Sequence, residues 1–347
     1  MGGLRLHRVG GGAGGGGQPL SSDLDFGSAE RGVRAVLRPA PLLEAPSLAE
    51  RVGRPVLLKL ESLQPTGSFK VRGALARLEA LSAEERTRGV VACSSGNHGR
   101  AVAWAAARTG VAATIFLPDW VDPVKLAGIR SAGAEAVLAG PTYDQAEARA
   151  LDEAKASGRP FVSAYDDPWV IAGQGTLGLE LADGPAAAAA TVVVPLSGGG
   201  LAGGVAAALR HRLGAAAPPV TAVSADRAAV MRASLAAGRP VELPEETTVA
   251  SALAGGIGLD NRWSFPLVRD EVAAHVTVTE HEIKDAIAMA YNDLGLVVEG
   301  GGAVGLAAVL GHDPVPPDAA DGAPVVVVVS GGNIALDTLS DVLREHA

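Results

Sequence analysis

The sequence contains very little cysteine: Cys93 is the one cysteine among 347 residues. A single thiol excludes an internal disulfide and any zinc site built from several cysteines, and it fits a reducing compartment. The N-terminus also lacks the continuous apolar segment of a signal peptide, so we expect the protein to be cytoplasmic.

Long apolar runs and clustered basic charge are lacking as well. The longest apolar stretches, such as the valine run at 325–329, fall far short of the roughly 20 residues that cross a bilayer. They indicate buried strands, and a membrane is not an expected partner. The 29 Lys and Arg residues are scattered in a chain of net charge −9, so nothing resembles a nucleic-acid-binding stripe and no nucleic acid is expected.

What is present is enough apolar sequence for a large core. The chain is 48% hydrophobic, and its length indicates about two domains. Residues 10–17 consist almost only of glycine, which is costly to order, so we expect residues 1–20 to form a flexible tail and assign them no function.

Short apolar runs alternate with segments of helical character. Because these runs are nearly continuous in apolar residues, they predict parallel strands covered on both faces, and hence an α/β fold. The predicted strands lie at residues 55–61, 89–94, 112–118, 191–195 and 324–330.

Four junctions at strand ends contain unusual chemistry. The first, residues 61–74, places Lys70 at the start of a helix in apolar surroundings. Desolvation and the positive helix end both disfavour the ammonium form of such a lysine, which makes its amine a better nucleophile. A solvated lysine on a helix surface is the alternative, and for a lone lysine it is the commoner one.

The second junction combines polar side chains with glycine in one turn: Ser94, Ser95, Gly96, Asn97 and His98. Serine and asparagine commonly cap helices, and a histidine here is more often structural than catalytic. The third, residues 195–204, is a glycine-rich turn before a helix and suits a phosphate, although it lacks both the P-loop ending and the dinucleotide fingerprint. The fourth, Ser330 with residues 331–333, offers a hydroxyl for a ring nitrogen or a simple helix cap.

In combination, the junctions resemble those of the fold type II pyridoxal-phosphate enzymes, specifically the threonine/serine dehydratase and serine racemase family. The resemblance spans roughly residues 35–345. Six elements carry it: residues 68–74 (SFKVRGA), 95–98 (SGNH), 170–176 (VIAGQGT), 198–200, Glu299 and 330–333 (SGGN).

The resemblance implies two open, mainly parallel sheet domains of the tryptophan synthase beta-like fold, with the cofactor in the cleft between them. Residues 21–88 with 167–347 would form the large cofactor-binding domain. Residues 89–166 would form a small domain that can close over the substrate. A homodimer is also implied.

The resemblance further assigns roles to the residues. Lys70 would carry pyridoxal 5'-phosphate as a Schiff base and then remove the Cα proton of the substrate. Residues 94–98 would bind the carboxylate of a small amino-acid substrate. The other implied cofactor contacts are Asn97 at the phenolic oxygen, the N–H groups of Gly198, Gly199, Gly200 and Leu201 at the phosphate, Ser330 at the ring nitrogen, and Glu299.

The implied activity is elimination of ammonia from a hydroxy-amino acid to give a 2-oxo acid, as in threonine and serine dehydratases. A neutral hydroxyl from Ser330 at the ring nitrogen favours this prompt β-elimination. Two alternatives stay open. Racemases of the family use a serine at the position of Ser95, and residues 254–265 with 298–303 resemble hydroxyectoine-utilisation dehydratases.

Three departures from the family pattern matter. Ser197 stands where the family usually has glycine, which the turn should tolerate. Serine racemases carry an acidic metal site after the strand at 220–224, whereas residues 224–230 (SADRAAV) lack its carboxylates, so no metal is expected. The C-terminal regulatory domain of biosynthetic threonine dehydratases has no counterpart, so isoleucine feedback is not expected.

Overall fold

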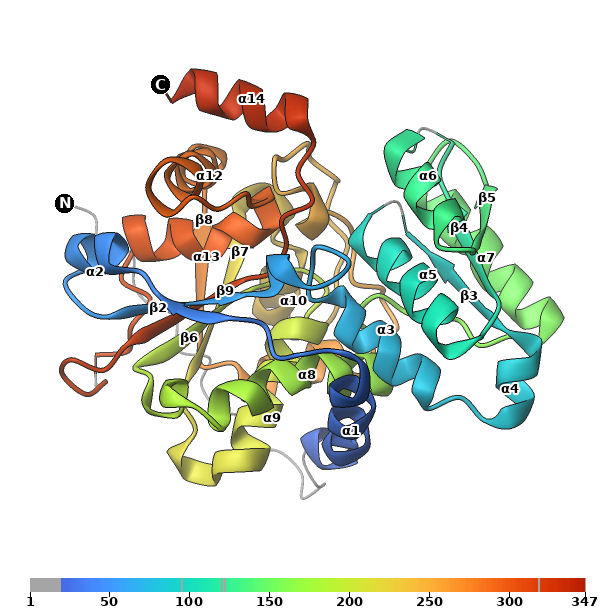
Figure 1. Ribbon diagram of the computed structural model, residues 1–347, viewed down its shortest axis with the longest axis horizontal. Helices are drawn as coiled ribbons and strands as arrows, with labels where there is room; N and C mark the ends of the chain where they lie inside the picture. The colour runs from blue at the N-terminus through green and yellow to red at the C-terminus, as the bar shows by residue number, and fades with distance from the viewer. Residues whose placement is uncertain (1–19, 95, 120, 122, 318, 347) are drawn as a thin grey trace.

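The computed structural model describes residues 20–94, 96–119, 121, 123–317 and 319–346. Nearly all of the predicted flexible tail, and also Ser95, therefore lie outside the described residues. Within the described part, the chain builds two sheets that lie side by side, each flanked by helices (Figure 1).

The larger sheet has six strands in the order β1-β2-β9-β6-β7-β8. All neighbouring strands are parallel except the short edge strand β1, which is antiparallel to β2. Its strands are β1 (Leu42–Glu44), β2 (Val56–Leu60), β6 (Thr191–Pro195), β7 (Val220–Ala225), β8 (Ala274–Val278) and β9 (Val325–Val329).

Helices cover both faces of this sheet. In β9, Val325, Val327 and Val329 pack in one core cluster, together with residues of α12 and α13, while Val326 and Val328 pack in another with α8 and α9. This alternation explains why the strand is apolar at every position. The helices outside the small sheet are α1 (Phe26–Val36), α2 (Pro46–Val52), α3 (Lys70–Glu79), α4 (Ala83–Arg88), α8 (Pro168–Ala182), α9 (Gly200–Leu213), α10 (Val230–Ala237), α11 (Ser264–Glu271), α12 (Glu280–Leu294), α13 (Gly300–Gly311) and α14 (Leu336–Glu345).

The smaller sheet has three parallel strands in the order β3-β4-β5, at the right of Figure 1. Ile115 of β4 belongs to a cluster that includes α5, α6 and α3, whereas Phe116 packs with α7 on the other face. The apolar core therefore continues from the small sheet to α3. These elements are β3 (Val90–Cys93), β4 (Ala113–Leu117), β5 (Glu135–Leu138), α5 (Asn97–Thr109), α6 (Pro123–Ser131) and α7 (Tyr143–Ser157).

Helix α8 packs between α3 and α9 through three glycines of its buried face. A Cβ atom would lie 2.7 Å from the Arg72 carbonyl oxygen at Gly173, 2.8 Å from the Gly204 carbonyl oxygen at Gly175, and 2.7 Å from the Val205 carbonyl oxygen at Gly178. Since such contacts are too short for any side chain, these positions require glycine. The glycines at 173, 175 and 178 thus bring the first turns of α3 and α9 close to α8.

The predicted α/β class, with mainly parallel sheets, is confirmed. All five predicted strands are present as β2, β3, β4, β6 and β9. No helix among the described residues combines the length and the apolar character that crossing a membrane requires.

Candidate active site

Lys70 is the first residue of α3 and is only partly exposed. Its Nζ atom donates a hydrogen bond of 2.8 Å to the Ala164 carbonyl oxygen and lies 5.1 Å from the centre of the Phe69 ring. Burial lowers the pKa of Lys70 to about 8, and the negative charge of Glu299 opposes this shift. A substantial fraction of the amine is therefore neutral near neutral pH, as a nucleophile requires.

Arg72, two residues further along α3, has a hydrogen-bond partner for every N–H group of its guanidinium. Its five N–H groups donate to Glu61, Glu180 and Thr176 at 2.7 to 3.0 Å. Glu180 also accepts a hydrogen bond of 2.6 Å from Lys59. Two cations thus meet two carboxylates in the interior, and this neutral cluster anchors the helix that carries Lys70.

Asn97, the first residue of α5, joins the second predicted junction to the fourth. Its Nδ2 atom donates to Glu299 Oε1 at 2.6 Å, and its Oδ1 atom accepts from Asn333 Nδ2 at 2.6 Å. Arg100 also donates to Asn333, at 2.8 Å. Because an amide nitrogen has two N–H groups, Asn97 can still donate to another acceptor, as the predicted cofactor contact requires.

The rest of the second junction has a mixed placement. His98 is buried, its Nε2 atom bonds the Val162 carbonyl oxygen at 2.9 Å, and burial lowers its pKa to about 3. This is the environment of a neutral structural histidine. Ser94 Oγ accepts a hydrogen bond from the Gly96 N–H group, and nothing lies within 4 Å of a Cβ atom at Gly96. Ser95 lies outside the described residues, so its predicted roles stay predictions.

The third junction forms a buried, uncapped helix N-terminus. Gly199 is the N-cap of α9 with φ of 88°, a conformation that favours glycine, and it has no side chain to accept the first N–H groups of the helix. Gly198, Gly200 and Leu201 are buried beside it. Such N–H groups bind anions, so the turn fits the phosphate of pyridoxal phosphate.

The fourth junction meets the first directly. The Phe69 N–H group donates to the Ser330 carbonyl oxygen at 3.0 Å, and Ser68 forms an isolated bridge with Gly331. The Ser330 hydroxyl is buried and donates to the Gly301 carbonyl oxygen at 3.2 Å, while the buried Ser68 hydroxyl finds no partner among the described residues. Polar groups thus remain available beside Lys70 for a polar ring.

Several site features have no counterpart in the sequence prediction. The Ala164 carbonyl oxygen, which holds Lys70, is a backbone atom and leaves no mark on the sequence. Asn333 belongs to the 330–333 motif, but the sequence assigns it no role, because its pairing with Asn97 and Arg100 crosses more than 230 residues of chain. Ser197, the departure from the family pattern, donates to the Leu253 carbonyl oxygen at 2.8 Å and so fits the turn.

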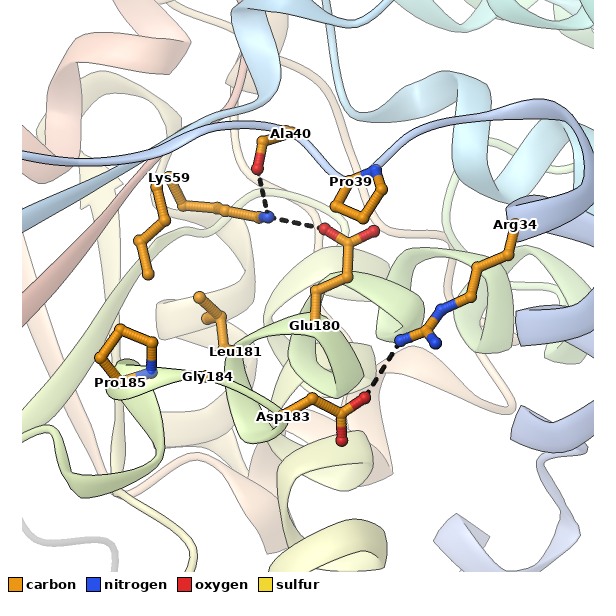
Figure 2. A pocket seen from close by; sticks show the side chains of 10 residues that line it. Arg34, Pro39, Ala40, Lys59, Glu180, Leu181, Asp183, Gly184 and Pro185 are labelled. Carbon is orange, nitrogen blue, oxygen red and sulfur yellow. Dashed lines mark hydrogen bonds and ion pairs between the residues drawn. The ribbon is translucent and has the colours of Figure 1, made fainter.

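A separate cavity of about 280 Å³ lies at the C-terminal end of α8, and Figure 2 shows it. The Lys59–Glu180 pair and the Arg34–Asp183 pair line it, and none of the predicted site residues does. Its charged groups already bind one another. The cavity therefore adjoins the ion pairs around Arg72 and is not part of the candidate active site.

One group of potential metal ligands also occurs among the described residues. His281 and Asp285 on α12 meet His346 near the end of the chain, with ligand atoms within 4.8 Å of one another. The elements α12 and α14 carry none of the residues predicted for the site, so this group is separate from it.

Comparison with known proteins agrees with this geometry. The family model described as "Pyridoxal-phosphate dependent enzyme" matches residues 33–331. The L-threonine ammonia-lyase of Thermotoga maritima is 38% identical over 92% of this chain and 78% of its own length.

Two solved structures are similar to the chain as well. The processed form of threonine deaminase isoform 2 from Solanum lycopersicum has a TM-score of 0.88 and 30% identity, covering 98% of this chain and 91% of that one. Maize serine racemase has a TM-score of 0.84 and 31% identity, covering 92% and 96%. The predicted family and its cofactor, pyridoxal phosphate, are confirmed. The chain belongs to the pyridoxal-phosphate dependent enzymes, within the fold type II group of threonine and serine dehydratases.

Proposed function

We propose that the protein is a threonine/serine ammonia-lyase, which converts a small β-hydroxy amino acid into a 2-oxo acid and ammonia. The observation that carries this proposal is the state of Lys70. Its amine is held by the Ala164 carbonyl oxygen and has a pKa of about 8. The neighbouring Phe69 bonds Ser330, and Tyr165, next to Ala164, packs on the phosphate turn.

The residues that would hold the cofactor are those of the four junctions. The N–H groups at the start of α9 suit the phosphate, Asn97 can donate to the phenolic oxygen, and the Ser330 hydroxyl can turn from Gly301 to the ring nitrogen. Bound pyridoxal phosphate supplies an aldehyde for an amine and an electron-withdrawing ring, which acidifies the Cα proton of an amino acid. Glu299 orients Asn97 by accepting from its amide group.

Lys70 has two tasks in this proposal: it binds the cofactor through its amine, and it later accepts the Cα proton. With a pKa of about 8, about one tenth of the amine is neutral at pH 7, compared with about one part in three thousand at the ordinary value of 10.5. On accepting the Cα proton the amine becomes an ammonium, which must release that proton to solvent before Lys70 can act as a nucleophile again. Residues 94–98 at the start of α5 would bind the substrate carboxylate, in part through its uncapped N–H groups.

The proposal includes the domain division. Residues 21–88 with 167–347 would be the large domain, residues 89–166 would be the small domain, and the cofactor would lie in the cleft between them. In support, β3, β4 and β5 all fall within the small segment and pair only with one another among the named strands. The bonds from Lys70 to Ala164 and from Asn97 to Glu299 cross the boundary, so movement of the small domain would alter the site directly.

The second candidate function is racemisation of serine or a related amino acid. The similarity to maize serine racemase favours it, as does the identity of residue 95, and the two functions share Lys70. The hydroxyectoine-utilisation subgroup stays a prediction about the physiological substrate.

The proposal also includes a homodimer and a location in the cytoplasm. The family resemblance supports a homodimer, and the single buried cysteine fits the reducing conditions of the cytoplasm. Light scattering of the purified protein should give twice the chain mass; a monomer mass would refute the dimer.

The central experiment supplies the purified enzyme with pyridoxal phosphate and either L-threonine or L-serine. We expect 2-oxo acid and ammonia in equal amounts, and a loss of at least about 10³-fold in rate for Lys70→Ala. Lys284→Ala, which removes a partly exposed lysine paired with Glu345, is the matched control and should keep wild-type activity. D-serine without pyruvate would favour the racemase instead, and unchanged turnover in Lys70→Ala would refute the role of Lys70.

A further inference from the structure

The segment at residues 163–167 leads from the small sheet back to α8 and contacts both Lys70 and the phosphate turn. The Ala164 carbonyl oxygen accepts the hydrogen bond from Lys70. Asp167 caps α8 through the Val170 N–H group and pairs with Arg77 of α3 at 3.0 Å. One short stretch of chain is thus in contact with the helix of the reactive lysine at two positions, Lys70 and Arg77.

Asp166, in the middle of this segment, caps a helix that is distant in sequence. Its Oδ1 atom accepts from the N–H groups of Trp263 at 2.7 Å and Ser264 at 2.9 Å, and its Oδ2 atom accepts from Arg262 at 2.9 Å. Ser264 is the first residue of α11, and Trp263, the N-cap residue, supplies no side-chain bond of its own. A carboxylate at this position also interacts favourably with the positive end of the helix.

Helix α11 in turn packs against the predicted phosphate turn. A Cβ atom at Gly199 would lie 2.8 Å from Val268 Cγ2 and 3.3 Å from Ser264 Cβ, and one at Gly203 would lie 3.1 Å from Leu267 Cβ. The first turn of α9 has no space to move toward α11. The position of α11 therefore sets the position of the turn.

Tyr165 covers the opposite side of the same turn. A Cβ atom at Gly198 would lie 2.3 Å from the Tyr165 ring, and one at Gly200 would lie 2.7 Å from the Tyr165 carbonyl oxygen. Three consecutive residues thus make three contacts: Ala164 with Lys70, Tyr165 with the phosphate turn, and Asp166 with α11. A displacement at Asp166 would move all three contacts together.

We propose that Asp166 is a positioning residue for cofactor binding: by capping α11 it fixes both the phosphate turn and the carbonyl group that holds Lys70. The inference rests on the cofactor of the proposed function, although not on its substrate. Asp166 need not touch the cofactor, because it acts through α11 and through its own chain neighbours.

The test is a titration of the apoprotein with pyridoxal phosphate, followed by absorbance, together with the melting temperature of each apoprotein. Asp166→Ala should raise the dissociation constant about fivefold or more, the fold-change expected when a helix cap of average strength is lost from the binding site. Thr279→Ala is the matched control, because Thr279 caps α12 through the Glu282 N–H group and α12 carries no predicted site residue. It should lower the melting temperature while leaving the dissociation constant unchanged.

Equal dissociation constants for the Asp166→Ala and Thr279→Ala proteins would overturn the inference, since Asp166 would then be an ordinary cap. If Asp166→Ala does not fold, Asp166→Asn decides: it can keep the two bonds to its oxygen but cannot accept from Arg262. A dissociation constant above the wild-type value supports the inference and the wild-type value overturns it. Because this readout needs no turnover, failure of the ammonia-lyase assay would refute the proposed function without affecting the titration.

Discussion

Two cationic side chains on the first turn of α3 have opposite environments. Arg72 is completely buried, all five of its N–H groups are bonded, and its pKa is raised: burial alone would lower it, but Glu61 and Glu180 outweigh that effect. Lys70 donates to one backbone carbonyl oxygen, and burial lowers its pKa to about 8. On the same helix, Arg72 is therefore a structural cation and Lys70 a reactive amine. Paired carboxylates stabilise the charged form of Arg72, whereas burial destabilises the charged form of Lys70 more than Glu299 stabilises it.

The largest expected effect is the loss of stability on replacing Arg72. Arg72→Met leaves two buried carboxylates with Lys59 as their one remaining cation, so the apoprotein should lose about 3 to 5 kcal/mol of unfolding free energy. Denaturant titration measures the loss.

Arg51→Met is the control for that measurement. Arg51 pairs with Asp293 at the surface, where an ion pair is worth at most about 1 kcal/mol. Similar losses in both variants would show that the buried cluster has no special role.

Replacement of Lys70 should have the opposite effect and stabilise the apoprotein. Below pH 8 the folded apoprotein holds an ammonium group at Lys70 against the effect of burial, so Lys70→Met should melt higher than wild type, by about 2 °C or more. Between pH 8 and 10.5 the unfolded chain keeps this proton and the folded protein has lost it. Wild-type stability therefore rises relative to the variant in that window.

Calorimetry across pH 6 to 11 follows the difference in melting temperature. A constant difference over the whole range would contradict the lowered pKa of Lys70.

A smaller effect is expected at Glu299, whose charge opposes the lowering of the Lys70 pKa. Glu299→Gln keeps an oxygen for Asn97 but removes this charge, so the pKa of Lys70 should fall further, by about one unit or less. The pH dependence of cofactor capture by the apoprotein measures it. A midpoint that moves upward would show that Glu299 acts in another way.

The smallest effect is expected for Ser197→Gly, which restores the residue usual in the family. It removes the bond to the Leu253 carbonyl oxygen and adds backbone freedom, which together should cost about 1 kcal/mol of stability. Cofactor affinity should stay within about twofold, because α9 and its N–H groups are unchanged. A tenfold loss of affinity would assign Ser197 to the phosphate site.

The sequence predicted the strands that are buried on both faces, because a continuous apolar run such as 325–329 has few other uses. It did not predict β1, which is a three-residue edge strand, or β5, whose residues are largely exposed and polar at one end. It also did not predict β8, whose burial alternates. Short or partly exposed strands leave weak patterns, so only the structure identifies them.

Prediction of the site was limited in a different way. Residues on the four junctions were found because their types carry chemistry, as for Lys70 and the glycines at 198–200. The partners of these residues could not be predicted. Lys70 bonds a backbone atom, the Ala164 carbonyl oxygen, and Glu180 lies 108 residues from Arg72 in the sequence. A sequence names the groups, whereas the pairing of Arg72 and the partial exposure of Lys70 follow from tertiary packing.

The account depends most on which lysine binds the cofactor, and the chain has five: Lys59, Lys70, Lys125, Lys155 and Lys284. Borohydride reduction of the protein with bound pyridoxal phosphate would fix the cofactor to its lysine, and mass spectrometry of the peptides would locate it. The account predicts the label on Lys70. A label on another lysine, with Lys70 unmodified, would contradict it.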